Sequence, residues 1–315
     1  MDTLAVTYRH IAYILSFETS TPELEVLLKT PSFNWDAIVV EGSNHLLLPA
    51  IYCRLKAKKL LHVLPKELVI YLEDITEINR NRNLALQNQI NFITQLFKKH
   101  NINHVFIKGA ALLALEPYED NAERMVGDID VLVSKNQLLT AFNLLKHNGY
   151  TKTFGFAYQT IGFRHLDRLI SPNELAAIEL HDELLIKKYR NLINIKEVLI
   201  SKRYINSIPI PSTYYLSKHQ ILARQLNDKG HFYNSVNLKT LYDSLILNVH
   251  TNDILLIDLL KLKFGQSYLA MAKYYFTEFT RVSSNKNLES YTIIHLKYIT
   301  NPVYKSVLKP IKHHY

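Results

Sequence analysis

The chain has 315 residues, of which 48% are hydrophobic and 21% charged, a balance typical of a folded globular protein with a sizeable core. Its net charge of +9 favours polyanionic partners such as nucleotides, nucleic acid or an anionic membrane surface, although it also fits plain solubility. The chain has a single cysteine, Cys53, so it cannot form an intramolecular disulfide. The sequence contains no run of 18 apolar residues, the length that a membrane helix needs. We therefore expect a cytoplasmic protein.

The N-terminal third has the pattern of a helical region. From Leu4 to about Leu96, apolar residues recur at three- and four-residue steps, which is the period of amphipathic helices. Residues 65–100 contain no internal Gly or Pro and predict one or two long helices, whose polar face is rich in Asn, Arg and Gln. We predict an N-terminal helical region at residues 1–84.

The pattern changes to alternating strands and helices in residues 85–205, the predicted core domain. A β-prone run and an acidic strand are each followed by a helix, and two extended segments flank a Ser-Pro-Asn turn at 171–173. In chain order, the predicted elements are a strand at 104–107, a helix at 110–115, a strand at 128–133, a helix at 135–147 and extended segments at 163–170 and 177–180.

After residue 205 the helical period returns and continues to the end of the chain. The alternating prolines of residues 208–211 (IPIP) favour extended backbone and suggest a linker. We predict a C-terminal helical domain at residues 206–315, made of three or four helices and a basic tail.

Two acids at alternate positions of one strand are the sharpest chemical feature. Side chains at i and i+2 of a strand point to the same face, so Asp128 and Asp130 lie side by side. Two carboxylates this close repel unless a cation lies between them, and Mg²⁺ is the usual cation at such a site. A solvent-exposed strand that carries two acids would give the same pattern. The neighbouring residues are therefore needed to distinguish a metal site from such a strand.

Cationic and glycine residues precede this strand. At Lys108-Gly109 a strand turns into a helix, so Gly109 allows a phosphate to approach the backbone and Lys108 adds a positive charge. Arg124, just before the acidic strand, is placed to clamp a triphosphate. The alternatives are an ordinary strand-to-helix turn and a solvated or salt-bridged loop arginine.

A second polar pair, Glu179 and His181, follows in the segment IELH. A third carboxylate from a neighbouring strand would complete a metal site, and we assign this role to Glu179. His181 is a hydrogen-bonding support, a metal ligand or a structural histidine, of which we favour the support.

Taken together, the runs IKGAALL, ERMVGDIDVLV, HNGY and IELHDEL resemble, in this order, the uncharacterised bacterial nucleotidyltransferase family of the polymerase-β superfamily. The resemblance implies an α/β (α+β) fold, in which a polymerase-β-type core with a small mixed sheet is flanked by N- and C-terminal helical regions. One departure concerns the turn, where the superfamily's Gly-Ser or Gly-Gly pair is here Gly109-Ala110, which removes one hydroxyl that could contact a phosphate.

The resemblance also implies roles for particular residues. Lys108, Gly109 and Arg124 match the triphosphate-binding positions. The metal-binding and catalytic acids are matched by Asp128, Asp130 and Glu179, and Asp243 matches a supporting position in the C-terminal helices.

The expected function is transfer of a nucleoside monophosphate from a nucleoside triphosphate such as ATP to an acceptor hydroxyl, with Mg²⁺ or Mn²⁺ as cofactor. We expect the acceptor to be RNA, in particular a tRNA end, or a protein, in a toxin or defence setting. The alternatives are a small-molecule nucleotidyltransferase, acting on an antibiotic or a sugar, and a catalytically silent nucleotide-binding module. No membrane partner is expected, and the oligomeric state stays open.

Overall fold

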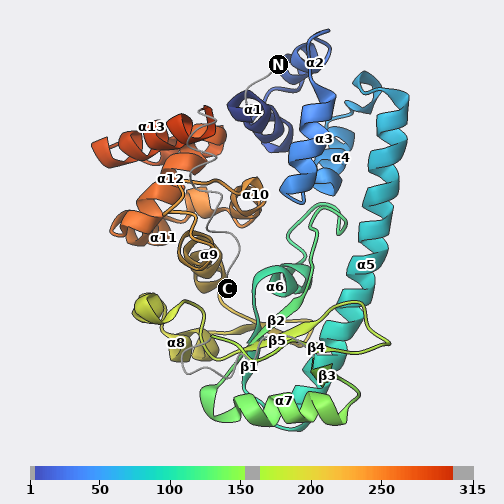
Figure 1. The fold of residues 1–315 in the computed structure, drawn as a ribbon, viewed down its shortest axis with the longest axis vertical. Helices are drawn as coiled ribbons and strands as arrows, with labels where there is room; N and C mark the ends of the chain where they lie inside the picture. Colours follow the sequence, from blue (N-terminus) through green and yellow to red (C-terminus); the bar gives the residue numbers. More distant parts are fainter. Residues whose placement is uncertain (1–3, 153–163, 301–315) are drawn as a thin grey trace. The chain divides into compact units, whose positions relative to one another are not determined.

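The computed structural model describes residues 4–152 and 164–300. The chain forms two compact units (Figure 1), with the boundaries inside the longest helix and after Ala223. We call residues 1–76 and 224–315 the helical unit, and residues 77–223 the sheet unit. The division predicted from the sequence, at residues 84 and 205, stays a prediction. None of the helices in the described ranges has the length and apolar character that crossing a bilayer requires.

The helical unit combines helices from both ends of the chain. Helix α1 supplies Ile11, Ile14 and Leu15, all fully buried, and packs against α3, α4, α12 and α13. The hydroxyl of Ser16 donates to Glu278 Oε1 at 2.9 Å and joins the two chain segments. The helices are α1 (Leu4–Leu15), α2 (Thr21–Leu28), α3 (Trp35–Asn44), α4 (Leu48–Ala57), the first part of α5 (Lys66–Lys99), α10 (Leu238–Ile246), α11 (Asp253–Leu260), α12 (Lys263–Tyr275) and α13 (Lys286–Thr300).

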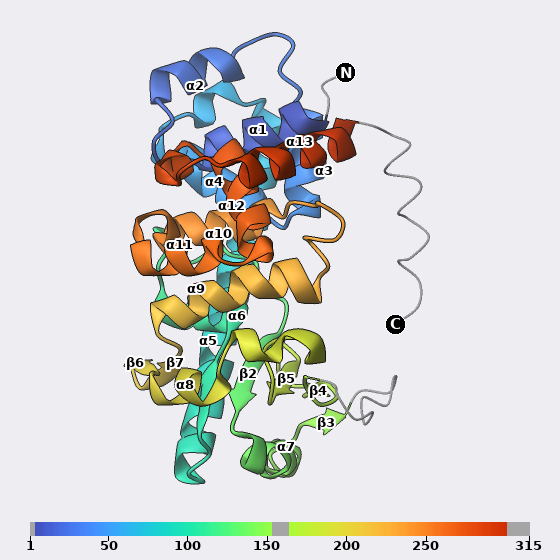
Figure 2. The same cartoon turned by 90° about the vertical axis from the view of Figure 1, so that its left-hand side faces the viewer.

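The sheet unit contains a five-stranded mixed sheet in the order β1-β2-β5-β4-β3. β2 and β5 are parallel neighbours, and the other pairings are antiparallel (Figure 2). The strands are β1 (His104–Phe106), β2 (Ile129–Val133), β3 (Thr151–Lys152), β4 (Leu169–Ile170) and β5 (Ile178–His181). The helices are the rest of α5, α6 (Lys108–Leu115), α7 (Leu138–His147), α8 (Ile195–Ile200) and α9 (Thr213–Leu222). This arrangement confirms the α/β fold class with a small mixed sheet and flanking helices.

The strand β2 and the helix α7 fit their local sequence. All five residues of β2 are buried, as expected of a strand covered on both faces. A 3₁₀ turn at Lys135–Gln137 precedes α7, and the chain leaves the helix through Gly149, whose φ of 90° lies in the left-handed region. The predicted strand–helix succession over 128–147 is confirmed. Of the extended segment predicted at 163–170, residue 163 lies outside the described residues, and β4 occupies only its last two positions.

The prediction that residues 208–211 form a linker is wrong. Ile208–Ile210 form a buried strand, β7, which pairs with β6 (Arg203–Ile205) in a two-stranded sheet and packs against β1. The turn between them has positive φ at Asn206 and Ser207, which suits a tight hairpin. Proline favours extended backbone, and an edge strand tolerates its missing N–H, so the same residues that suggested a linker fit a hairpin.

The C-terminal helices also differ in number from the prediction. Between residues 206 and 300 the structure has five α-helices, α9 to α13, because short turns at Asn248, Asn252 and Leu262 divide the predicted stretches. The predicted basic tail lies outside the described residues.

Candidate active site

The acidic residues meet where β2 and β5 run side by side. In this parallel pair Asp130 lies opposite Glu179, so the two side chains point to the same face of the sheet. Asp130 is only 2% exposed and Glu179 is 7% exposed. Asp128 immediately precedes β2, and its side chain is 31% exposed. The sheet thus holds two buried carboxylates next to a third that is open to solvent.

Three basic side chains contact these acids. The ammonium group of Lys108 forms an ion pair with Asp130 Oδ1, and His181 Nε2 lies 2.7 Å from the same oxygen. His181 Nε2 is also 3.6 Å from Glu179 Oε2. Arg168 bridges the other two acids, with Nε 2.5 Å from Glu179 Oε1 and a terminal nitrogen 2.9 Å from Asp128 Oδ2. Each of the three carboxylates therefore contacts a basic group.

The acids respond to these surroundings in different directions. Burial raises the pKa of Asp130, but the positive charge of Lys108 and the hydrogen bond with His181 outweigh it and hold the pKa below its ordinary value. Burial likewise raises the pKa of Glu179, and the contacts with His181 and Arg168 bring it below the ordinary value. For Asp128, burial and the charges of Asp130 and Glu179 raise the pKa. The basic groups therefore favour the ionised forms of Asp130 and Glu179.

The start of α6 positions the lysine. Lys108 has a φ of 53°, a left-handed conformation that costs about 1 kcal/mol or more for a non-glycine residue. The backbone N–H of Ile107 donates to the carbonyl of Asp130 at 3.0 Å and fixes this turn against β2. A Cβ added to Gly109 would lie 3.0 Å from Val126 Cγ1, so the glycine also permits close packing of the turn against the loop before β2.

The polar face of α5 holds the loop that leads into the acidic strand. The Asn79 amide donates to the carbonyl of Ala122 at 2.6 Å, and the Asn83 amide donates to those of Asn121 and Arg124 at 2.7 and 2.9 Å. These bonds satisfy carbonyl groups that an irregular loop would otherwise leave without partners. The Asn- and Arg-rich helix face noted in the sequence therefore supports residues 116–127.

The site has a donor set for a divalent cation. Asp130, Glu179 and His181 each offer one ligand atom, and these atoms lie within 4.8 Å of one another. Two carboxylates with one imidazole fit a cation that accepts both oxygen and nitrogen ligands, such as Mn²⁺, while Mg²⁺ would rely mainly on the carboxylates. The predicted metal set was Asp128, Asp130 and Glu179; Asp128 contacts Arg168, and its role as a ligand stays a prediction.

The structure brings most, though not all, of the predicted site residues together. Lys108, Asp128, Asp130, Glu179 and His181 are joined by the contacts above. The Arg124 guanidinium donates to the carbonyl of its neighbour Met125 at 2.5 Å. Asp243 lies on α10 in the helical unit, where it is 2% exposed. The roles of Arg124 and Asp243 stay predictions.

Two residues outside the predicted set of site residues lie at the acids or close to them. Arg168 bridges Asp128 and Glu179, because the antiparallel pairing of β4 with β5 brings Arg168 opposite Glu179; this register cannot be read from the sequence. His219, on α9, is 2% exposed, and neither ring nitrogen has a hydrogen-bond partner among the described residues. Burial, followed by the charges of Lys108 and His181, lowers its pKa to about 3. α9 packs against α6, so this imidazole lies close to the acidic site.

A small mixed sheet with carboxylates on two adjacent strands is consistent with the nucleotidyltransferase fold. A family model described as uncharacterised nucleotidyltransferase matches residues 31–261, and the chain belongs to this family. The matched range includes all the acids and basic groups described above. No curated protein matches the chain.

Proposed function

We propose that this nucleotidyltransferase uses Asp128, Asp130 and Glu179, with a divalent cation, to transfer a nucleoside monophosphate from a nucleoside triphosphate to an acceptor hydroxyl. One observation carries the proposal: Asp130 and Glu179 are in register on adjacent parallel strands and buried, with Asp128 beside them. Burying carboxylates this close together lowers the stability of the fold unless cationic groups neutralise their charges. Membership of the family supports nucleotidyl transfer as the reaction class.

The cofactor we assign is Mg²⁺ or Mn²⁺, held by Asp130, Glu179 and His181. When bound, such a cation neutralises phosphate charge and makes a nearby hydroxyl more acidic. The choice between the two metals depends on whether the imidazole binds the cation or orients Asp130.

The chain's own residues bind the triphosphate and accept the proton. Lys108 and Arg168 have side chains 32% and 52% exposed, so both ammonium and guanidinium groups are open to incoming phosphates as well as to the acids. Gly109 and Arg124 are assigned to the same phosphates. These groups would stabilise the charge that develops on the leaving pyrophosphate.

The bond changes balance as follows. The acceptor oxygen forms a bond to the α-phosphorus, and the bond from that phosphorus to the oxygen bridging the β-phosphate breaks. Pyrophosphate leaves with the electron pair of that bond. The acceptor proton passes to Asp128, the carboxylate of the three that is most open to solvent.

For the acceptor we propose a hydroxyl of RNA, in particular a tRNA end, because the net charge of +9 attracts a polyanion. A protein hydroxyl, a small antibiotic or sugar, and no acceptor at all are the competing outcomes of the test.

The test is incubation of the full chain with each α-labelled nucleoside triphosphate, Mg²⁺ or Mn²⁺, and, in separate reactions, total cellular RNA, protein, and a set of aminoglycosides and sugars. Label in RNA supports the proposal in full, and label in protein or in a small molecule supports the reaction but corrects the acceptor. Asp128→Asn/Asp130→Asn is the inactive control, and Asp74→Asn, an exposed acid on α5, is the matched control. No label with any triphosphate and acceptor pool, or equal label with the double variant, would contradict the proposal.

A further inference from the structure

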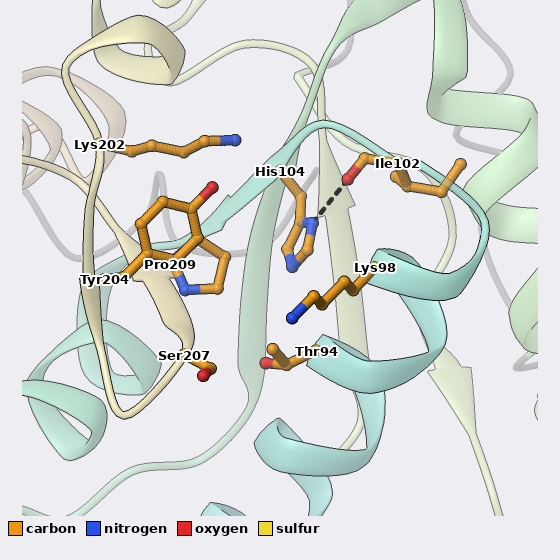
Figure 3. A pocket seen from close by; sticks show the side chains of 8 residues that line it. All are labelled: Thr94, Lys98, Ile102, His104, Lys202, Tyr204, Ser207 and Pro209. Carbon is orange, nitrogen blue, oxygen red and sulfur yellow. Dashed lines mark hydrogen bonds between the residues drawn. The ribbon is translucent and has the colours of Figure 1, made fainter.

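A cavity lies within the sheet unit, on the opposite face of the sheet from the acids. Its volume is about 360 Å³, and it is bordered by the end of α5, by β1 and by the β6–β7 hairpin. The lining residues, shown in Figure 3, are Thr94, Lys98, Ile102, His104, Lys202, Tyr204, Ser207 and Pro209.

Strand pairing separates this cavity from the candidate active site. In the antiparallel pair of β1 and β2, His104 lies opposite Val133, and both side chains therefore point to one face. Asp130 is an odd number of residues from Val133 along β2, so its carboxylate points to the other face. A ligand in the cavity would contact neither Asp130 nor its partner Glu179 through the sheet.

The imidazole of His104 is aimed into the cavity with one nitrogen unused. Nδ1 lies 2.9 Å from the carbonyl of Ile102, and because a carbonyl only accepts, the proton is on Nδ1. Nε2 has no hydrogen-bond partner among the described residues, and Figure 3 shows it facing the space between Lys98 and Tyr204. The residue is 4% exposed, and its burial lowers its pKa to about 4, so at neutral pH Nε2 is a buried acceptor.

The charge of the cavity is positive. Lys98 and Lys202 both line it, and none of the eight described lining residues is acidic. Lys202 Nζ donates to the amide oxygen of Asn103 at 2.6 Å, a neutral partner that leaves the ammonium charge uncompensated. The hydroxyl-bearing residues Thr94, Tyr204 and Ser207 also line the cavity, beside the apolar Ile102 and Pro209.

We propose that this cavity binds a phosphorylated sugar, with the phosphate held by Lys98 and Lys202 and a sugar hydroxyl donating to His104 Nε2. Two ammonium groups match a phosphate, and the neutral imidazole acceptor requires a ligand that also brings a donor. The volume suits a ligand larger than a bare anion. The same chemistry is offered by a free sugar phosphate or nucleotide and by one unit of an RNA strand.

The test is calorimetric titration of the full chain in EDTA with inorganic phosphate, ribose 5-phosphate, AMP and a short 5′-phosphorylated RNA. We expect ribose 5-phosphate or AMP to bind one to one, about tenfold or more tighter than inorganic phosphate, since each added hydrogen bond contributes on this scale. Tight binding of the RNA alone would assign the site to a strand. Binding of inorganic phosphate as tightly as any sugar phosphate, or no binding of any probe, would overturn the proposal.

Variants connect the binding to these side chains. Lys98→Ala/Lys202→Ala should weaken binding about tenfold or more, while Lys146→Ala/Lys196→Ala, an equal charge change at exposed positions outside the lining, should not. His104→Asn keeps a donor for the Ile102 carbonyl but removes the acceptor, whereas His104→Gln offers an amide oxygen near the Nε2 position. Asparagine should therefore weaken binding more than glutamine. Binding that survives both the double lysine change and His104→Asn would contradict the assignment. If a histidine variant fails to fold, the lysine variants, which change partly exposed side chains, still test the proposal.

The outcome is separable from the proposed function. Asp128→Asn/Asp130→Asn should bind ribose 5-phosphate as the unchanged chain does, because the acids point to the other face of the sheet.

Discussion

The two faces of one sheet carry opposite charges in this protein. On one face, Asp130 and Glu179 are buried, and each contacts a basic group. On the other face, His104 and two lysines border a cavity whose described lining contains no acid. The pleat makes this separation possible, since neighbouring residues of β2 point in opposite directions.

The two faces differ in whether their buried polar groups already have partners within the chain. Buried carboxylates without partners would be very unfavourable, so the acidic face is held by ion pairs within the chain. The basic face leaves a buried acceptor, His104 Nε2, with no partner among the described residues. We therefore expect the acidic face to lose function when a partner is removed, and the basic face to gain stability when a ligand is added.

The largest effect should come from Asp130, the acid that contacts both Lys108 and His181. Asp130→Asn keeps the shape but removes the charge, and we expect kcat/KM for nucleotidyl transfer to fall about 1000-fold, as for loss of a group that stabilises the transition state. Steady-state kinetics with the preferred triphosphate measures it, beside Asp74→Asn. Activity within a few-fold of the unchanged chain would remove Asp130 from the site.

Arg168 tests whether the basic partners do more than neutralise the acids. Because Arg168 bridges Asp128 and Glu179, Arg168→Ala should lower kcat/KM about 100-fold, and Arg168→Lys should recover part of the loss through its charge. Arg281→Ala, an exposed arginine in the helical unit, is the matched control. If both variants kept the activity of the unchanged chain, the guanidinium would have no role in binding the triphosphate.

His219 distinguishes use by the site from a purely structural role. Its two ring nitrogens lack partners among the described residues, so His219→Phe should raise the free energy of unfolding by about 1 kcal/mol. If the imidazole contacts nucleotide or acceptor, the same variant should lose about tenfold in kcat/KM. Urea denaturation and kinetics on one preparation compare the two. A more stable variant with unchanged kinetics would make His219 structural.

The basic face should give a pH dependence of stability instead of a loss of activity. Burial lowers the pKa of His104 to about 4, so between pH 6.5 and pH 4 the unfolded chain takes up a proton that the folded chain does not. The stabilising contribution is complete above pH 6.5 and is lost as the pH falls towards 4. From pH 7 to pH 5 the chain should lose about 2 kcal/mol more than His104→Asn does. Urea denaturation at the two pH values measures both proteins. If the unchanged chain and His104→Asn lost the same free energy of unfolding, His104 would not be buried as a neutral imidazole.

The sequence predicted those parts of the fold and site that depend on local pattern. The strand and helix over 128–147, the long helix of residues 66–99 and the fold class follow from periodicity, turn residues and the family motifs. Lys108 contacts Asp130, and their two motifs, which follow one another in the sequence, had been predicted to form one site.

Features that depend on register or on distant segments were missed. Arg168 reaches Asp128 and Glu179 only because β4 pairs with β5 at one particular register, which a period-2 pattern does not fix. The hairpin at 203–210 was mistaken for a linker because proline favours extended backbone in both settings. The cavity around His104 brings together residues from 94 to 209, and no short motif contains them.

The most direct test of the central claim follows the two ends of the triphosphate. A nucleoside triphosphate labelled at the α-phosphate and one labelled at the γ-phosphate are each incubated with the chain, the divalent cation and the acceptor. The α-label should become attached to the acceptor, and the γ-label should appear in pyrophosphate in equal amount, with neither change in Asp128→Asn/Asp130→Asn. Attachment of the γ-label to the acceptor, or α-label transfer by the double variant, would contradict nucleotidyl transfer at these acids.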